Sequence, residues 1–414
     1  MFSIVFSVLA SQMALAAVPM SVTYDDLPKL VREKNQNVTG AEQFTKAAEA
    51  RTGHLVRSYL PVLRAEVGGE HFQTGSYNVK TQPYGALEAR INLFRGGRDY
   101  LEAGARQNQA VIAESSTKKT YVSELTQARH VYSSLLFTRE SIGLIGEAIK
   151  RNEQSLAAAN RRIARGLGTE TDRLEFEIYR SQLKEDLESF QHEEKLIEIR
   201  LASVLAVDLA TKFKTPPRIV HEHDETLINT RFAPESNPDV AALKASQEAS
   251  LSQKSISNLW WMPSLDVYGG YYLYTLRERD YLNQAARDDF VGGLRFTIEL
   301  FDGYRSKSEA SAFALQAQGY EEQAIQRTHQ ADAQVQVAKE ALKHDHELIH
   351  GSEERIVQGR KYLSRTLDEY NRGVKNSIDV LSAAQKWLSF ERQYAERRRD
   401  YQITKSGLLA LMGQ

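Results

Sequence analysis

The feature that most constrains the fold is an apolar repeat in the C-terminal part of the chain. Apolar side chains recur there every seven residues, at Val335, Leu342, Ile349, Ile356, Leu363 and Tyr370. This spacing places them along one seam of a supercoiled helix, which needs partner helices to cover it. No proline interrupts the stretch after Arg305, so the predicted helix has roughly 65 to 70 residues and is about 100 Å long at 1.5 Å per residue.

A second helix of the same kind precedes it. Between Arg98 and Arg165 the apolar positions again lie seven apart, at Tyr121, Ala128, Leu135, Ile142, Ile149, Leu156 and Ile163. Gly166 and Gly168 end this pattern, and a return helix is predicted from Asp172 to Val204. Gly373 ends the later helix in the same way. The sequence therefore predicts two long helical hairpins.

Each hairpin follows two stretches in which apolar and polar residues alternate. These stretches are Leu63 to Glu70, Leu87 to Leu93, Leu265 to Leu273 and Leu294 to Leu300. A period of two predicts strands with one apolar face. Strands of about ten residues, apolar outside and charged inside with aromatic residues near their ends, are typical of a transmembrane barrel. A small sheet that caps a coiled coil is the alternative.

The two halves of the chain align at an offset of about 207 residues, which places Ala128 on Val335 and Gly166 on Gly373. We therefore predict a tandem duplication of helix, two strands and a long helical hairpin. The first repeat covers residues 17–207 and opens with a helix from Tyr24 to Ser58; the second covers residues 236–414. Residues 208–235 form a polar, proline-bearing connector whose composition argues against a packed element.

Residues 1–16 form an apolar run that ends in Ala14-Leu15-Ala16, so we predict a signal peptide; a buried structural helix is the alternative. No later stretch has ~18 consecutive apolar residues, so no membrane-spanning helix is expected in the mature chain. The chain has no cysteine, which excludes disulfides and thiol catalysis.

Charge and motifs exclude several classes of function. Lys and Arg number 53 against 54 for Asp and Glu, without a basic stripe, so nucleic acid is not an expected partner. No nucleophile, base and oxyanion arrangement and no phosphate-binding glycine loop can be found, so we expect neither an enzyme nor a cofactor. Two groups of residues are candidate metal ligands: His344, His346 and His350, and the segment from His221 to Glu225. A solvated surface is the favoured interpretation of both groups, so no metal site is expected.

Four strands cannot close a barrel, because about eight is the smallest number that does, and an open edge in lipid leaves backbone groups unsatisfied. Several chains must therefore contribute strands. Two copies would give eight strands around a filled lumen, and three would give twelve around a lumen wide enough for water.

Two motifs, one of which occurs twice, carry a resemblance to a known family. Phe-x-Gly-x-Arg occurs where each strand pair leads into a long helix, at Phe94 to Arg98 and at Phe301 to Arg305. Tyr-x-x-Gly-x-x-x-x-x-Asp-Val-Leu spans the second turn, from Tyr370 to Leu381. With the duplicated order of elements, the chain resembles the TolC family of outer-membrane efflux proteins over nearly its whole mature length. The resemblance implies a mainly α fold with a membrane β-barrel, in which three chains form one twelve-stranded barrel and an α-helical tunnel across the periplasm.

The resemblance also implies a function. The chain would be the outer-membrane exit duct of a tripartite efflux or type I secretion system in a Gram-negative cell, in contact with outer-membrane lipid. Its partners would be two further copies, a periplasmic adaptor protein and an inner-membrane pump. A structural periplasmic coiled-coil spacer is the alternative, and a periplasmic metal-binding protein is a third class. The exported substrate and the class of pump stay open.

A gate is implied at the inner tip. The tip turns contain Gly166, Gly168 and Gly373. By position, Tyr370 and Lys375 resemble residues that link to the other repeat, Asp172 resembles their carboxylate partner, and Asp379 resembles a member of an acidic ring. The alternative is that both aspartates only cap the return helices.

Overall fold

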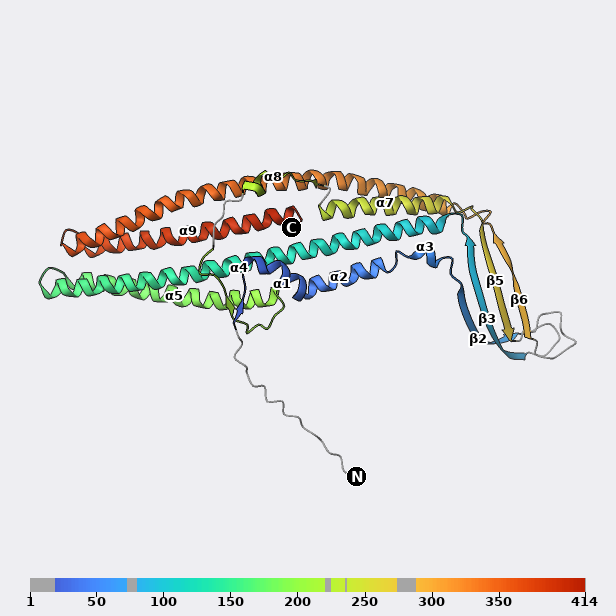
Figure 1. Ribbon diagram of the computed structural model, residues 1–414, viewed down its shortest axis with the longest axis horizontal. Coiled ribbons are helices and arrows are strands. Elements are labelled where there is room, and N and C mark those ends of the chain that lie inside the picture. Colours follow the sequence, from blue (N-terminus) through green and yellow to red (C-terminus); the bar gives the residue numbers. More distant parts are fainter. Residues whose placement is uncertain (1–18, 73–79, 220–224, 235–236, 274–287, 414) are drawn as a thin grey trace, which may run out of the picture. The chain divides into compact units, whose positions relative to one another are not determined.

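The computed structural model describes residues 19–72, 80–219, 225–234, 237–273 and 288–413 (Figure 1). The predicted signal peptide and the His221 to Glu225 segment, except for Glu225, lie outside these ranges. Within the described ranges, no helix combines the length and the hydrophobicity that crossing a membrane requires.

The described chain runs through one series of elements twice. The first series is α1 (Leu27–Lys34), α2 (Gln36–Glu49), α3 (His54–Arg57), β2 (Val62–Phe72), β3 (Lys80–Phe94), α4 (Arg98–Ala164) and α5 (Glu170–Val204). The second is α7 (Pro238–Asn258), β5 (Ser264–Leu273), β6 (Asp288–Thr297), α8 (Arg305–Asn371) and α9 (Ser377–Leu411). The helices α4 and α8 have 67 residues each, which confirms the lengths predicted from the heptads. The repeat boundaries themselves remain predictions.

The helix predicted from Tyr24 to Ser58 is wrong in detail, because the structure has the short 3₁₀ helix η1 (Tyr24–Asp26) and then three separate helices. Asn35 separates α1 from α2. Its side-chain oxygen accepts hydrogen bonds from the backbone N–H groups of Asn37 and Val38, at 2.9 and 3.2 Å. An asparagine in this role caps a new helix instead of continuing the old one. The fourth strand was predicted from Leu294 to Leu300, but β6 begins earlier, at Asp288, and ends at Thr297.

The connector prediction is wrong as well. The segment contains β4 (Phe213–Lys214), which pairs in parallel with β1 (Met20–Ser21), and α6 (Glu225–Asn229). Phe213, Ile219, Leu227 and Ile228 are buried and belong to hydrophobic clusters with the long helices. A few apolar residues among many polar ones are therefore enough to hold this segment against the hairpins.

The strands form one antiparallel sheet in the order β2-β3-β5-β6 (Figure 1). Strand β3 of the first repeat pairs with β5 of the second, with Ala89 opposite Gly269. Large apolar side chains stay exposed on one face: Leu63, Val67, Leu87, Leu294 and Phe296. Within the described residues, β2 and β6 are each paired on one side only. The sheet therefore has an uncovered apolar face and two open edges.

The chain divides into two compact units, and each combines segments of both repeats. The sheet unit contains Ala41–Thr117 and Pro238–Thr328; the hairpin unit contains Met1–Gly40, Lys118–Asn237 and His329–Gln414. In the hairpin unit α4 lies antiparallel to α5, and α8 antiparallel to α9 (Figure 1). Neither repeat forms a compact unit by itself.

The predicted seam of α8 is confirmed, because all six of its heptad residues from Val335 to Tyr370 are buried. The seam of α4 agrees only in part. Ala128 and Leu135 are fully buried, but beyond them the buried positions move by three residues to Ile145, Asn152 and Ala159. A polar residue fits in this seam because the Asn152 side chain donates to the Phe176 carbonyl at 2.8 Å.

Candidate functional site

The two hairpin turns have the same backbone geometry. Gly166 and Gly373 have φ values of +71° and +86°, in the left-handed region that a residue with a Cβ adopts only at a cost. After Gly166, the Leu167 N–H donates to the Arg162 carbonyl at 2.9 Å, and after Gly373, the Val374 N–H donates to the Glu369 carbonyl at 2.9 Å. These bonds are the helix-ending pattern that a left-handed glycine permits.

Gly168 has a different role, since its φ is not positive. A Cβ at Gly168 would lie 3.3 Å from the Cβ of Arg162 and 3.4 Å from Ile163. The residue therefore lets the turn pass close to the last helical turn of α4. Gly166 and Gly373 thus have a left-handed backbone that favours glycine, and Gly168 has a close neighbour that leaves little room for a side chain.

Both predicted gate aspartates cap return helices. The Asp172 N–H donates to Thr169 Oγ1 at 3.2 Å, and the Thr169 N–H donates to Asp172 Oδ2 at 2.9 Å. The Asp379 N–H donates to Asn376 Oδ1 at 3.0 Å, and the Asn376 N–H donates back to Asp379 Oδ2 at 3.4 Å. Each pair is a reciprocal capping box. The capping role is thus present at both turns, and it leaves one oxygen of each carboxylate for other contacts.

Ser377, at the start of α9, links the two hairpins. Its hydroxyl lies 2.6 Å from Asp172 Oδ1 and 2.5 Å from Glu175 Oε2, both on α5, and can donate to one of them at a time. Partial burial acts to raise the pKa of the Asp172 carboxyl, but the hydrogen bonds from Ser377 and Thr169 outweigh it and hold that pKa below its usual value. Sequence reasoning missed Ser377 because it compared charged and aromatic positions only.

Lys375 does not reach Asp172 within one chain. Its Nζ lies 3.7 Å from Asp379 Oδ1, four residues further along. Both side chains are more than a third exposed, so this pair is solvated and contributes little by itself. Of the four predicted gate residues, the structure thus brings Lys375 and Asp379 together and leaves Asp172 with Ser377.

Tyr370 forms the buried centre of the tip. Its side chain is 2% exposed, and its ring packs edge-on against Phe176 with centroids 6.0 Å apart. Burial raises the pKa of the Tyr370 hydroxyl, against the opposing effect of the nearby Arg162. The hydroxyl is therefore neutral over the physiological range, and the ring holds α5 against α8.

Arg162 is a further residue of the tip that sequence reasoning missed. Its guanidinium lies 4.4 Å above the Tyr370 ring, donates to the Tyr370 carbonyl at 2.6 Å and donates to the Leu167 carbonyl at 3.1 Å. It thus joins the C-terminal ends of α4 and α8, where a cation complements both helix dipoles. A signal was available: at the offset of the repeat, Arg162 falls on Glu369, an opposite charge.

The geometry of the tip can be set beside known proteins. Residues 232–414 match the sequence profile of a family described as outer membrane efflux protein. The sequence match to this outer membrane efflux protein family thus covers the second half of the chain. A search of curated protein sequences gave no significant match. The matched family and the fold are those of outer-membrane channel proteins.

Solved structures show that the efflux fold extends beyond the matched residues. The outer membrane protein VceC of Vibrio cholerae has a TM-score of 0.77 at 16% identity, over 94% of this chain and 96% of that one. The CmeC outer membrane channel of Campylobacter jejuni has a TM-score of 0.76 at 14% identity, over 94% and 85%. The open state of the MtrE channel of Neisseria gonorrhoeae has a TM-score of 0.74 at 15% identity, over 94% and 88%. The fold is thus shared over nearly the whole chain.

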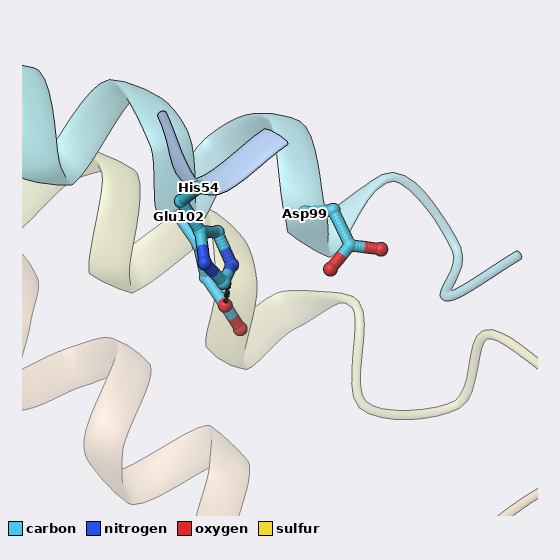
Figure 2. Close-up of side chains that lie close together, drawn as sticks. All are labelled: His54, Asp99 and Glu102. Atoms are coloured by element: carbon cyan, nitrogen blue, oxygen red, sulfur yellow. Dashed lines mark hydrogen bonds and ion pairs between the residues drawn. The ribbon is translucent and has the colours of Figure 1, made fainter. Parts of the chain in front are cut away.

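A group of possible metal ligands lies in the sheet unit of the efflux protein (Figure 2). His54 of α3 and Asp99 and Glu102 of α4 offer ligand atoms within 4.8 Å of one another, and His54 Nε2 lies 2.8 Å from Glu102 Oε2. Arg95 Nη1 lies 3.0 Å from Asp99 Oδ1, and Asn92 donates to Asp99 Oδ2 at 2.9 Å. The guanidinium already supplies the cation, so a metal would have to displace it.

The histidines that the sequence singled out are less well placed. The His346 and His350 rings are 4.7 Å apart, and His350 Nδ1 lies 3.5 Å from Glu353 Oε2. The His350 side chain is 66% exposed. The group around His54 was not among the candidates that the sequence offered.

Proposed function

We propose that this efflux protein is the outer-membrane exit duct of a tripartite efflux or type I secretion system. It works as a homotrimer, with a periplasmic adaptor protein and an inner-membrane pump that supplies the energy. The observation that carries this proposal is the four-stranded sheet with two open edges and one exposed apolar face. In lipid, each open edge must be paired, because unpaired backbone groups there cost several kcal/mol each.

Three copies satisfy the edges and leave room for transport. In a closed ring, β6 of one chain would pair with β2 of the next, which gives twelve strands. The apolar face with Leu63 and Leu294 would then contact lipid, and the charged face with Arg64 and Arg295 would line the lumen. Twelve strands enclose a wider lumen than the eight of the smallest barrels, in which side chains fill the interior.

The tip turns are proposed as the periplasmic gate. Asp172, Tyr370, Lys375 and Asp379 are the gate residues expected from the family, and Arg162 and Ser377 join them on the contacts described above. Links of this kind are individually worth only ~1 to 3 kcal/mol. A gate closed by a few such links is stable at rest and can open when a partner supplies competing contacts.

The oligomeric state in detergent tests the duct. We expect the full chain, extracted from outer membranes, to sediment as a trimer and to form ion-conducting pores in planar bilayers. A structural spacer would leave the membrane in a high-salt wash and would not conduct. A monomer or dimer without conductance contradicts the proposal.

A further inference from the structure

A cavity of about 560 Å³ lies against the charged face of the sheet, within the sheet unit. Residues of all four strands and of the segment from 54 to 62 line it. Its charged lining consists of Arg64, Arg90, Arg95, Arg295, Glu88 and Asp266, with His54 beside them. Four of these side chains are arginines and two are carboxylates, and Asp99 and Glu102 pair with Arg95 from beside the lining. The cavity can therefore attract an anion where one of these arginines has no carboxylate partner.

Two of the arginines already have carboxylate partners. Arg90 Nη2 lies 2.5 Å from Asp266 Oδ2, and the Asp266 side chain is only 4% exposed. Arg95 is paired with Asp99, as described above. Among the described residues, no carboxylate pairs with Arg295. Its charge is thus available to a ligand.

Arg295 is held in place by an aromatic ring. Its guanidinium carbon lies 4.6 Å from the centroid of Tyr268, on the neighbouring strand. Stacking uses one face of the planar guanidinium, and its N–H groups, which point outward in that plane, stay free to donate. Such a fork matches the two oxygens of a carboxylate.

Gly293 makes the room for this ring. It is the direct partner of Tyr268 in the pairing of β5 with β6. A Cβ at Gly293 would lie 3.3 Å from the Tyr268 hydroxyl oxygen and 3.4 Å from its Cζ. The ring thus lies over the glycine, with Arg295 stacked on it. The platform is already formed in the single chain.

We propose that Arg295, supported by Tyr268, is the anchor of a binding subsite for a small amphipathic organic carboxylate. The carboxylate accepts from the free N–H groups of Arg295. Its apolar body lies against Leu60 and Val62, which also line the cavity. A role of the subsite in transport rests on the proposed function, because the subsite would hold anionic cargo in the lumen. Binding of the carboxylate itself does not depend on the proposed function.

Titration of salicylate into the full chain in detergent, followed by saturation-transfer NMR, tests the subsite. Loss of one charge-assisted contact should weaken binding by about tenfold or more in Arg295→Gln. Arg295→Lys keeps the charge and should lose less. Thr297→Gln, two residues along on the same strand face, is the matched control and should bind as the unchanged protein does. Benzyltrimethylammonium, a cation of similar size, should not compete.

Gly293→Ala adds a second arm, because the new methyl displaces the ring and should weaken salicylate binding while keeping every charge. Equal salicylate affinity in Arg295→Gln and in the unchanged protein would overturn the subsite, and so would competition by the cation. Bilayer conductance separates this from the duct. If the protein conducts and Arg295→Gln binds salicylate with unaltered affinity, the duct proposal stands and the subsite is refuted. If Arg295→Gln loses salicylate binding but the protein never conducts, the subsite stands and the duct proposal is refuted.

Discussion

The tip of the hairpins offers the sharpest test of gating. Two contacts there join the hairpins of one chain: the Ser377 hydroxyl on the carboxylates of α5, and the Arg162 guanidinium on Tyr370. We expect the double variant Arg162→Gln with Ser377→Ala to shift the resting gate toward its open state. The substitutions leave the glycine turns and both capping boxes unchanged, so the helices themselves should persist.

The size of the effect follows from the two contacts. A hydrogen bond to a carboxylate contributes ~1.5 to 3 kcal/mol, and a cation over an aromatic ring ~0.5 to 2 kcal/mol. Together they stabilise the closed state by about 2 to 5 kcal/mol per chain, if their contributions add. Since 1.4 kcal/mol is a factor of ten, the ratio of closed to open should fall at least about thirtyfold.

Single-channel conductance of the purified trimer in planar bilayers measures this shift. The double variant should show a higher mean conductance and longer open times than the unchanged protein. Arg161→Gln with Ser389→Ala is the matched control, because both residues are exposed and neither joins the hairpins. If the double variant forms an intact trimer and conducts like the control, these contacts do not close the gate and the reasoning is refuted.

Three further predictions concern the charge of the tip, the facing of the strands and the turn geometry. Because the pKa of Asp172 is lowered, its links stabilise the closed tip at any pH above the usual carboxyl range and are lost only as the pH falls through the lowered pKa. The conductance of the trimer should therefore stay constant from pH 7 to 5 and rise below about pH 4. A rise near pH 6 would point to another group. Leu294→Arg should reduce the yield of folded trimer far more than Thr297→Arg, since an arginine at mid-membrane costs ~2 to 4 kcal/mol on the lipid face; equal yields on a native gel would reverse the assigned facing. Gly373→Val strains a left-handed turn by ~1 kcal/mol or more and should weaken adaptor-dependent export in cells. Gly351→Val, in the middle of α8 at ordinary φ, should not. Unimpaired export in Gly373→Val would show that this turn is not part of the tip that contacts the adaptor.

Local patterns predicted most of the elements. The heptads, in stretches that no proline or glycine turn interrupts, indicated the lengths of α4 and α8. The alternation from Leu63 and from Leu294 gave strands with one apolar face. The glycine turns were also local, since Gly166 and Gly373 stand where the heptad pattern stops and the backbone must reverse.

The errors share a cause. The helix predicted from Tyr24 to Ser58 fails at Asn35, whose side chain also donates to the Val204 carbonyl, 169 residues away. The connector packs because Phe213 and Ile219 meet partners on α4 and α5 that no local pattern reveals. The seam of α4 shifts to Asn152, which is tolerated there only because the Phe176 carbonyl accepts a hydrogen bond from its side chain.

The candidate site at the tip was likewise predicted only in part. The sequence identified Asp172, Tyr370, Lys375 and Asp379 by their place in two repeated turns, and the capping of both return helices could be expected from the same positions. Which of them meet was not predictable, because a hydrogen bond between hairpins depends on the rotation of each helix about its own axis.

The sequence by itself determined the heptad period, the turns and which residues share a strand face, since each of these depends on neighbours within a few residues. Only the tertiary structure decided how the repeats combine. Strand β3 pairs with β5, Arg162 meets Tyr370, and Arg295 stacks on Tyr268 over Gly293, each across separate segments of the chain. Side-chain contacts of this kind depend on distances of a few ångströms between segments, and a pattern along one chain carries no information about those distances.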